Sequence, residues 1–182
     1  MLELILTTRR ETRLLERMRN HYSQPKGFVG RTLAYAVLYK NDYYGHILAG
    51  SATLHLPNRN EFFGIEKSQL NQIINNVFFN ISPFQKKYPI RNFGTKVLDK
   101  FIELSKHDWQ QKYGDQVIGF ETLVEPPRTG EIYLRSGWKE IGKTKGLTCK
   151  RIGGKGFEKW GGKRIWYYKT LRPKLVFALK VS

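Results

Sequence analysis

The thirty residues from 117 to 146 constrain the fold of this chain more than any other segment. They open with an apolar run that contains one ionisable residue, Glu121, and stops at Pro126-Pro127. A short amphipathic stretch at 131–136 ends at a Gly-Trp pair, and a second strand-like piece begins at Lys139. Apolar runs of this length are typical of buried strands, and proline interrupts strands and helices alike. The segment therefore predicts a strand, a proline corner, a short helix and a second strand.

Strand and helix signals alternate along the rest of the chain. Runs of β-branched and aromatic residues flank Asn41-Asp42 and predict a hairpin, while Thr8 followed by Glu11 predicts a helix start. The expected elements are a strand at 1–7, a helix ending at Asn20, hairpin strands at 32–40 and 43–54, a loop at 57–64, a short helix at 67–75, strands at 77–81 and 164–170, and a long helix at 92–110. This alternation predicts an α/β fold in which helices flank a mixed central sheet.

Length and composition favour one globular domain. The chain has 182 residues, 40% of them hydrophobic, which is enough to bury a sizeable core. No stretch approaches the roughly 18–20 apolar residues of a membrane span. The single cysteine, Cys149, excludes an internal disulfide and a multi-cysteine metal cluster, and it has no visible base partner for nucleophilic catalysis. We therefore expect a cytoplasmic protein that makes no membrane contact.

Positive charge is concentrated near the C-terminus. The formal net charge is +17, and residues 139–182 hold 13 Lys and Arg against two acidic residues, a net of +11. Aromatic residues alternate with these cations, which suits a partner that offers both phosphates and bases. The alternative is a solvated basic face whose aromatic residues belong to the core. We expect a nucleic acid to be contacted by Lys145, Lys150, Arg151, Lys155, Lys159, Lys163 and Arg164.

The same shift in composition divides the chain. We expect a main domain at 1–150 and a basic, aromatic-rich extension at 151–182 that completes the sheet and contacts the nucleic acid.

Several residues on the expected elements are candidates for chemistry. Burial of Glu121 would raise its pKa and suit it to act as a base, whereas the alternative is an ion pair with an arginine or lysine. Tyr133 is either a functional hydroxyl or a core aromatic residue. Asn75-Asn76 forms either a turn into a strand or a site that hydrogen-bonds a base edge. Glu125 fits a carboxylate at a strand end, and Trp138 fits the core.

The order of the elements resembles the GNAT (N-acetyltransferase-like) fold, which has a mixed, mostly antiparallel sheet. Arg91, Asn92, Phe93, Gly94 and Thr95 stand where that family has its pyrophosphate loop, at a helix start whose backbone N–H groups and dipole suit a phosphate. The family usually has a second glycine where Thr95 or Lys96 stands. The resemblance implies acetyl-CoA or another small-group donor at this loop.

A second resemblance covers about residues 21 to 146. Its motifs are His21-Tyr22, Asn75-Asn76-Val77-Phe78-Phe79, Arg91-Asn92-Phe93-Gly94, Asp108-Trp109, Glu121-Thr122-Leu123-Val124-Glu125-Pro126, Ile132-Tyr133, Gly137-Trp138 and Gly142-Lys143-Thr144-Lys145-Gly146. In these motifs the chain resembles the phage Mom family and the related module of the Druantia anti-phage protein. Mom proteins convert the exocyclic amine of adenine in DNA to a carbamoylmethyl derivative, which protects phage DNA from restriction.

These resemblances imply specific roles for the candidate residues. The Mom family implies a transferase that takes a flipped adenine of double-stranded DNA into its cleft, with His21, Tyr22, Glu121 and Tyr133 as catalytic residues. The position of Tyr133 implies a general acid for a leaving thiolate. The donor is left open, and iron held by His21 with carboxylates is a possibility without a motif of its own. The alternatives are a non-catalytic DNA-binding module of the Druantia type and an ordinary GNAT acetyltransferase.

Overall fold

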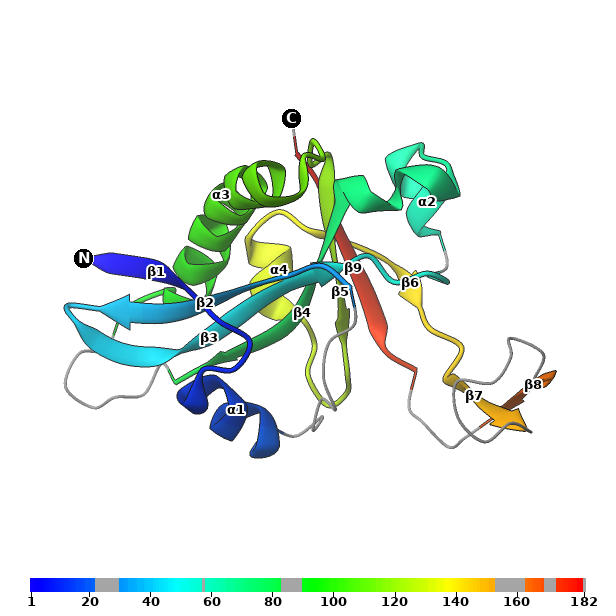
Figure 1. Ribbon diagram of the computed structural model, residues 1–182, viewed down its shortest axis with the longest axis horizontal. Helices are drawn as coiled ribbons and strands as arrows, with labels where there is room; N and C mark the ends of the chain where they lie inside the picture. Colours follow the sequence, from blue (N-terminus) through cyan, green and yellow to red (C-terminus); the bar gives the residue numbers. More distant parts are fainter. Residues whose placement is uncertain (22–29, 57, 83–89, 153–162, 169–172, 182) are drawn as a thin grey trace.

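A seven-stranded sheet forms the centre of the protein (Figure 1). The computed structural model describes residues 1–21, 30–56, 58–82, 90–152, 163–168 and 173–181, with the backbone alone at 147–152 and 163–168. The strands of the sheet are, in spatial order, β1 (Leu2–Thr7), β2 (Thr32–Tyr39), β3 (Asp42–Ser51), β4 (Ile73–Ile81), β5 (Gly119–Val124), β9 (Leu175–Lys180) and β6 (Lys139–Lys143). Only β4 and β5 are parallel within this sheet. The expected mixed, mostly antiparallel sheet is confirmed.

Helices cover both faces of the sheet. The helical elements of the described residues are α1 (Thr12–Arg19), α2 (Arg59–Phe63), the 3-10 turn η1 (Lys67–Gln72), α3 (Phe93–Tyr113) and α4 (Glu131–Arg135). Successive strand residues point to opposite faces, so neighbours on β2 reach different helices. Tyr35 packs in the cluster of α3, and its neighbour Ala34 packs against Leu14 of α1. The cluster under α3 is the larger of the two and holds most of the buried aromatic residues.

Two turns differ from the sequence expectation by a few residues. The β2–β3 hairpin turns at Lys40 and Asn41, with φ of 50° and 66°, rather than at Asn41-Asp42. Two residues in the left-handed region match the twist of the paired strands, which fixes the turn one residue earlier. Helix α1 begins at Thr12, and its cap is Glu11, whose carboxylate accepts the N–H of Leu14 at 3.2 Å.

Two segments were assigned to the wrong element by the sequence pattern. The expected loop at 57–64 contains the helix α2, and the expected helix at 67–75 is the short η1 turn followed by strand β4. Ile73 and Ile74 match a helical spacing with Leu70, but their burial comes from the sheet, where both are fully buried. For short apolar runs, the partner strands decide between helix and strand.

The chain leaves the sheet between β6 and β9 and returns at the same point. Thr144 N–H donates to the carbonyl of Lys174, and Lys174 N–H donates to the Thr144 hydroxyl, both at 2.9 Å. Residues 145–173, called here the excursion, include a two-stranded antiparallel sheet of β7 (Leu147–Ile152) and β8 (Lys163–Tyr168). The boundary expected at residue 150 falls inside β7, and the division of the chain into two domains stays a prediction.

Strand β9 was not expected from the sequence. Its run Leu-Val-Phe-Ala-Leu-Lys lies between β5 and β6 and pairs with both. The apolar residues at 175–179 after Pro173 were the available signal, which the charge around them obscured. Among the residues that the structure describes, no helix has the length and apolar character needed to cross a membrane.

Candidate active site

The two parallel strands at the centre of the sheet separate along their length. Residues Ile73–Asn75 of β4 pair with Gly119–Glu121 of β5. Beyond these residues the two strands no longer pair with each other. Residue Val77 of β4 is the extra residue of a β-bulge, since Ala49 of β3 pairs with Asn76 and Leu48 pairs with Phe78. The wedge between the strands contains a cavity of about 760 Å³, and we call this cavity the cleft. The unpaired strand edges leave backbone groups available to a ligand.

The cleft is lined from both faces of the sheet. Gly94 of α3 and Tyr133 of α4 line it from one face, and His21, which follows α1, lines it from the other. His21 packs on Phe78 with ring centroids 4.9 Å apart, and Phe78 belongs to the cluster of α1. Two reactants could therefore meet in the wedge from opposite sides of the sheet.

Tyr133 is held rigidly in the wall of the cleft. Its ring stacks on Phe177 with centroids 5.8 Å apart and meets Trp138 at 5.0 Å. Gly130 caps the N-terminus of α4, where φ is 77° and an added Cβ would lie 2.4 Å from the Phe177 ring, so only glycine fits. The hydroxyl of Tyr133 donates to Oδ1 of Asn76 at 3.3 Å. Tyr133 thus lies in the cleft wall, as expected for a functional hydroxyl, and its ring also packs in the core, which was the alternative expectation.

Asn75 and Asn76 lie within β4, so the turn considered for them is wrong. Asn75 Nδ2 donates to the Thr53 hydroxyl at 3.0 Å, and the carbonyl of Asn76 accepts from the Thr122 hydroxyl at 2.9 Å. Both side chains line the cleft and are almost fully buried. Asn75 Oδ1 and Asn76 Nδ2 have no hydrogen-bond partner among the described residues. Two polar atoms in the cleft wall thus lack the partner that buried polar groups normally have.

His21 brings a titratable side chain to the wall of the cleft. Its burial, and then the charge of Arg128, lower the pKa of the imidazole below 6.5, while Glu125 opposes them. Both of these charged residues line the cleft with it. The imidazole is therefore neutral near pH 7 and able to accept a proton. Tyr22, expected to act beside it, lies outside the described residues.

Glu121 forms a buried ion pair away from the cleft. Its carboxylate contacts Arg59 Nη1 of α2 at 2.5 Å and accepts the N–H of Thr53 at 2.6 Å. Burial raises the pKa of Glu121, and Arg59 and then Thr53 oppose that rise. The neighbours of Glu121 on β5 face α3, so its side chain lies on the face opposite Tyr133. The structure thus contains the ion pair that was the alternative to a catalytic base, and it does not bring Glu121 together with Tyr133.

The segment that resembles a pyrophosphate loop lies at the start of α3. Asn92 has φ of 56° and precedes the first helical residue, Phe93, which is buried in the core. Gly94 lines the cleft, and Arg91, which precedes Asn92 in the chain, is exposed to solvent. The N–H groups of the first turn of a helix have no intrahelical acceptor and suit an anion. Arg91, Gly94 and Thr95 are therefore placed where a phosphate could bind, whereas the side chain of Phe93 is committed to packing.

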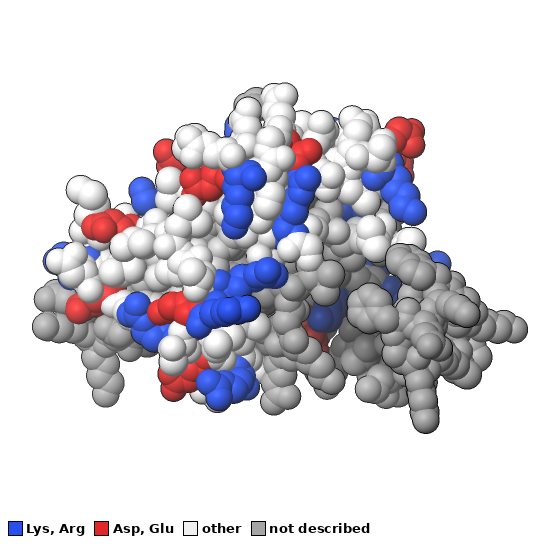
Figure 2. All heavy atoms as spheres, in the orientation of Figure 1, with Lys and Arg blue, Asp and Glu red and all other residues white. Residues whose placement is uncertain are grey.

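Few of the expected DNA-binding side chains belong to the described part of the chain. Lys145 is exposed at the start of the excursion. The backbones of Lys150, Arg151, Lys163 and Arg164 lie in β7 and β8, and their side chains fall outside the description, as do Lys155 and Lys159 entirely. Figure 2 shows lysines and arginines spread among acidic residues over the visible face of the molecule. The contact of this surface with a nucleic acid stays a prediction.

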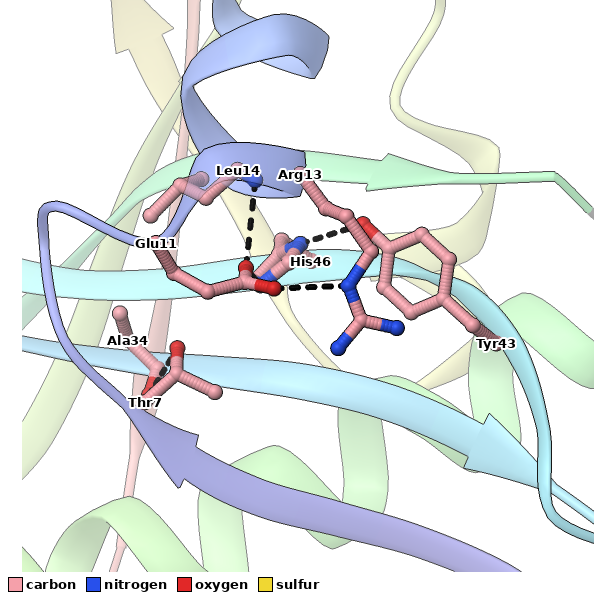
Figure 3. A network of polar contacts seen from close by, with 7 residues as sticks. All are labelled: Thr7, Glu11, Arg13, Leu14, Ala34, Tyr43 and His46. Atoms are coloured by element: carbon pink, nitrogen blue, oxygen red, sulfur yellow. Dashed lines mark hydrogen bonds and ion pairs between the residues drawn. The ribbon is translucent and has the colours of Figure 1, made fainter.

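A second polar network, which sequence reasoning missed, lies under α1 (Figure 3). The Tyr43 hydroxyl and Nδ1 of buried His46 are 2.6 Å apart, and Nε2 lies 2.6 Å from the Glu11 carboxylate without the geometry of a hydrogen bond. Burial lowers the pKa of His46 to about 4, against the opposing charge of Glu11, so we take the imidazole as neutral despite this contact. Arg17 extends the network to the cleft, since it donates to Asn80 at 2.6 Å.

The resemblance left iron open as a ligand of this site. In the described ranges, no group of three or more His, Cys, Asp and Glu side chains is arranged to hold a metal ion. The suggestion that His21 and carboxylates bind iron therefore gains no support from side-chain placement.

Comparisons with known proteins identify the fold. No family model and no curated protein matches the sequence. A Bacillus subtilis acetyltransferase in complex with CoA aligns over 100% of both chains with a TM-score of 0.59 and 12% identity. A GNAT family acetyltransferase from Elizabethkingia anophelis with acetyl-CoA bound covers 99% of this chain and 98% of its own, with a TM-score of 0.55 and 12% identity. The aminoglycoside acetyltransferase AAC(6')-Ib, in complex with coenzyme A and kanamycin, aligns with a TM-score of 0.56 and 13% identity. The alignment covers 99% of this chain and 95% of that enzyme. The chain has the GNAT acetyltransferase fold, as expected.

Proposed function

We propose that this protein is an acyltransferase of the GNAT type, which moves an acyl group from a CoA thioester to an amine. The observation that carries the proposal is the wedge between β4 and β5, with Tyr133 in its wall and lining residues from both faces of the sheet. The structural neighbours support it, since those described above have this fold and were solved with CoA or acetyl-CoA.

The wedge suits the shape and chemistry of such a donor. The arm of CoA is extended and carries amide groups, which can hydrogen-bond to the open edges of β4 and β5 as an added strand would. Its phosphates would reach the start of α3, where Gly94 exposes the backbone and Arg91 adds a fork of donors. Lys96, where the family usually has glycine, is exposed and adds positive charge rather than bulk inside the cleft. The residues present therefore fit the donor.

The residues at the cleft divide the proton transfers between them. CoA supplies the activated acyl group and leaves as a thiol. Neutral His21 accepts the proton that the attacking amine loses, because its lowered pKa keeps it unprotonated at neutral pH. The Tyr133 hydroxyl donates a proton to the leaving sulfur from the opposite face of the sheet. Glu121 takes no part in this scheme, since Arg59 holds its carboxylate.

The charge of the protein favours a second, more specific candidate. A net charge of +17 exceeds what a small amine requires and suits a polyanion. The amine would then be the exocyclic amine of adenine in DNA, taken out of the stack into the cleft, as the resemblance to the Mom family implies. The Lys and Arg residues of the excursion would hold the DNA. The group transferred would be the carbamoylmethyl unit, which bonds to nitrogen through its CH₂ carbon, so this candidate replaces acyl transfer by alkyl transfer from a different donor. A DNA-binding module without catalysis is the remaining alternative.

Two measurements separate these candidates. Isothermal titration of the wild-type protein with acetyl-CoA tests the donor, and absence of binding by folded protein would refute the acyltransferase proposal. Mass spectrometry of nucleosides from DNA co-expressed with the protein tests the acceptor. A new adenine derivative supports the DNA enzyme, and unmodified DNA together with acetyl-CoA binding leaves an ordinary amine as the acceptor. Binding of DNA without donor binding or modified bases would identify the non-catalytic module.

A further inference from the structure

One buried donor in the cleft wall has no partner in the described part of the protein. Asn76 is only 4% exposed, lines the cleft, and leaves its side-chain Nδ2 without an acceptor. A buried polar group without a hydrogen bond destabilises a fold, so its presence in a cleft wall requires a physical reason, and a catalytic or ligand-binding role is one. The donor thus points to an acceptor atom that arrives with the ligand.

Two contacts hold Asn76 in place, one at its side-chain amide and one at its backbone. Oδ1 accepts the Tyr133 hydroxyl at 3.3 Å, so the amide nitrogen is the atom left for another partner. The backbone of Asn76 is held by the Thr122 hydroxyl, which donates to its carbonyl at 2.9 Å. Asn76 also begins the part of β4 that runs apart from β5, immediately before the bulge at Val77. The Nδ2 group is therefore a preorganised donor at the narrow end of the wedge.

We propose that Nδ2 of Asn76 donates a hydrogen bond to the carbonyl oxygen of the acyl donor and stabilises the charge that develops there. This inference rests on the proposed acyltransferase function. In a thioester, the oxygen and the sulfur are bonded to the same carbon. A sulfur placed to receive the proton of Tyr133 therefore brings the oxygen next to the amide that already contacts this tyrosine.

The transfer step balances with this assignment. The amine nitrogen forms a bond to the carbonyl carbon, and the π electrons of the carbonyl move to the oxygen that Asn76 holds. When these electrons return, the carbon–sulfur bond breaks, and the sulfur leaves with its electron pair and takes the proton of Tyr133. The proton lost by the amine passes to His21 and through solvent restores the Tyr133 hydroxyl. The products are an amide and the thiol form of CoA, with no other reactant required.

A purely structural role for Asn76 makes a different prediction. If the residue served only to hold Tyr133, then Oδ1 would be the important atom. Asn76→Asp keeps an oxygen for the tyrosine and replaces the donor with a carboxylate oxygen, and Asn76→Leu removes both polar atoms at a similar volume. Asn71→Asp is the matched control, because this asparagine is exposed on η1, outside the cleft, and receives the same change of charge.

The test measures binding of two CoA analogues at pH 8.5, chosen to favour the ionised form of the carboxyl in Asn76→Asp, because burial raises the pKa of a carboxyl. One is a ketone with CH₂ between sulfur and carbonyl, and the other is an S-alkyl thioether without a carbonyl. We expect the wild type and Asn71→Asp to bind the ketone about tenfold more tightly than the thioether, and both Asn76 variants to lose this preference. With acetyl-CoA, kcat of the Asn76 variants should fall by about 100-fold or more.

The outcomes distinguish this inference from the function on which it rests. A wild type that binds both analogues equally, or an Asn76→Asp variant that keeps the preference, overturns the role of Asn76 and leaves the acyltransferase proposal intact. If the folded wild type binds neither analogue nor CoA, the proposed function fails, and the role of Asn76 fails with it. Should Asn76→Leu fail to fold, Asn76→Asp alone decides.

Discussion

The ion pair between Arg59 and Glu121 offers a quantitative test of how the site is built. Arg59 is 1% exposed and Glu121 is fully buried. Apart from the 2.5 Å contact with Glu121, the guanidinium donates to the carbonyl of Thr53 at 2.9 Å and to Asn60 at 2.6 Å. Replacing Arg59 with methionine keeps the aliphatic stem and removes all three bonds. The carboxylate then keeps the Thr53 N–H alone, in a site from which water is excluded.

Removal of one partner from a buried ion pair costs about 3–5 kcal/mol, because the other charge remains desolvated. For a chain of this length, that loss lowers the unfolding temperature by roughly 6–20 °C. The loss depends on pH with a definite sign. Burial already raises the pKa of Glu121, and Arg59 is the largest opposing influence, so the variant raises it further. A carboxyl whose pKa is higher in the folded than in the unfolded protein stabilises the fold below about pH 4.5. This contribution is lost as pH rises through the pKa of the folded state.

The measurement is urea unfolding of wild type and Arg59→Met followed by circular dichroism at pH 5 and pH 8. The variant should lose more stability at pH 8 than at pH 5. A double variant, Arg59→Met with Glu121→Leu, should recover most of the loss, because two apolar residues replace the pair. The reasoning is refuted if Arg59→Met costs less than about 1 kcal/mol at pH 8, or costs the same at both pH values. Acyl transfer by a folded double variant would exclude Glu121 as the catalytic base.

Three further outcomes follow from the same contacts. Tyr133→Phe should lower kcat by about 100-fold or more and the stability by only about 1 kcal/mol, and equal rates for the two proteins would remove Tyr133 from the proton transfer. The acid limb of kcat/KM should have its midpoint below pH 6.5 and disappear in His21→Gln, whereas persistence of that limb in the variant would exclude His21 as the base. The pKa of His46 is lowered to about 4 in the folded protein, so as pH falls the imidazole becomes protonated in the unfolded chain at a higher pH than in the folded protein. The free energy of unfolding should therefore fall by up to about 3 kcal/mol as pH drops from 6.5 to 4. His46→Gln should flatten this decline in urea titrations, and an unchanged slope would contradict the neutral assignment.

Local patterns were sufficient for the elements whose partners are close in sequence. The hairpin of β2 and β3, the long helix α3 and the unit from β5 to β6 each carry their own alternation, helical spacing or turn residues. Strand β4 shows the limit of this reasoning. Ile73 and Ile74 fit a helix equally well, and only pairing with β3 and β5 assigns them to a strand.

The sequence predicted the place of a site residue only where a local element of the fold positions that residue. Tyr133 lines the cleft because the short helix after the proline corner points it there, and that helix was visible in the sequence. Arg59, in contrast, is 62 residues from Glu121 along the chain and lay in a segment expected to be a loop. No local pattern could pair them, so the choice between a catalytic carboxylate and an ion pair required the three-dimensional contact.

The mutual hydrogen bonds of Thr144 and Lys174 have a consequence for how this protein can be altered. They join the two ends of the excursion where it leaves and rejoins the sheet, and the register pairs of β5, β9 and β6 contain no residue of 145–173. That segment holds nine Lys and Arg against the single acidic residue Glu158, a net of +8 out of +17. A short turn grafted from Thr144 to Lys174 would therefore halve the net charge and keep the wedge. Under the proposals made above, the attraction of the substrate and the chemistry would lie in separable stretches of one chain.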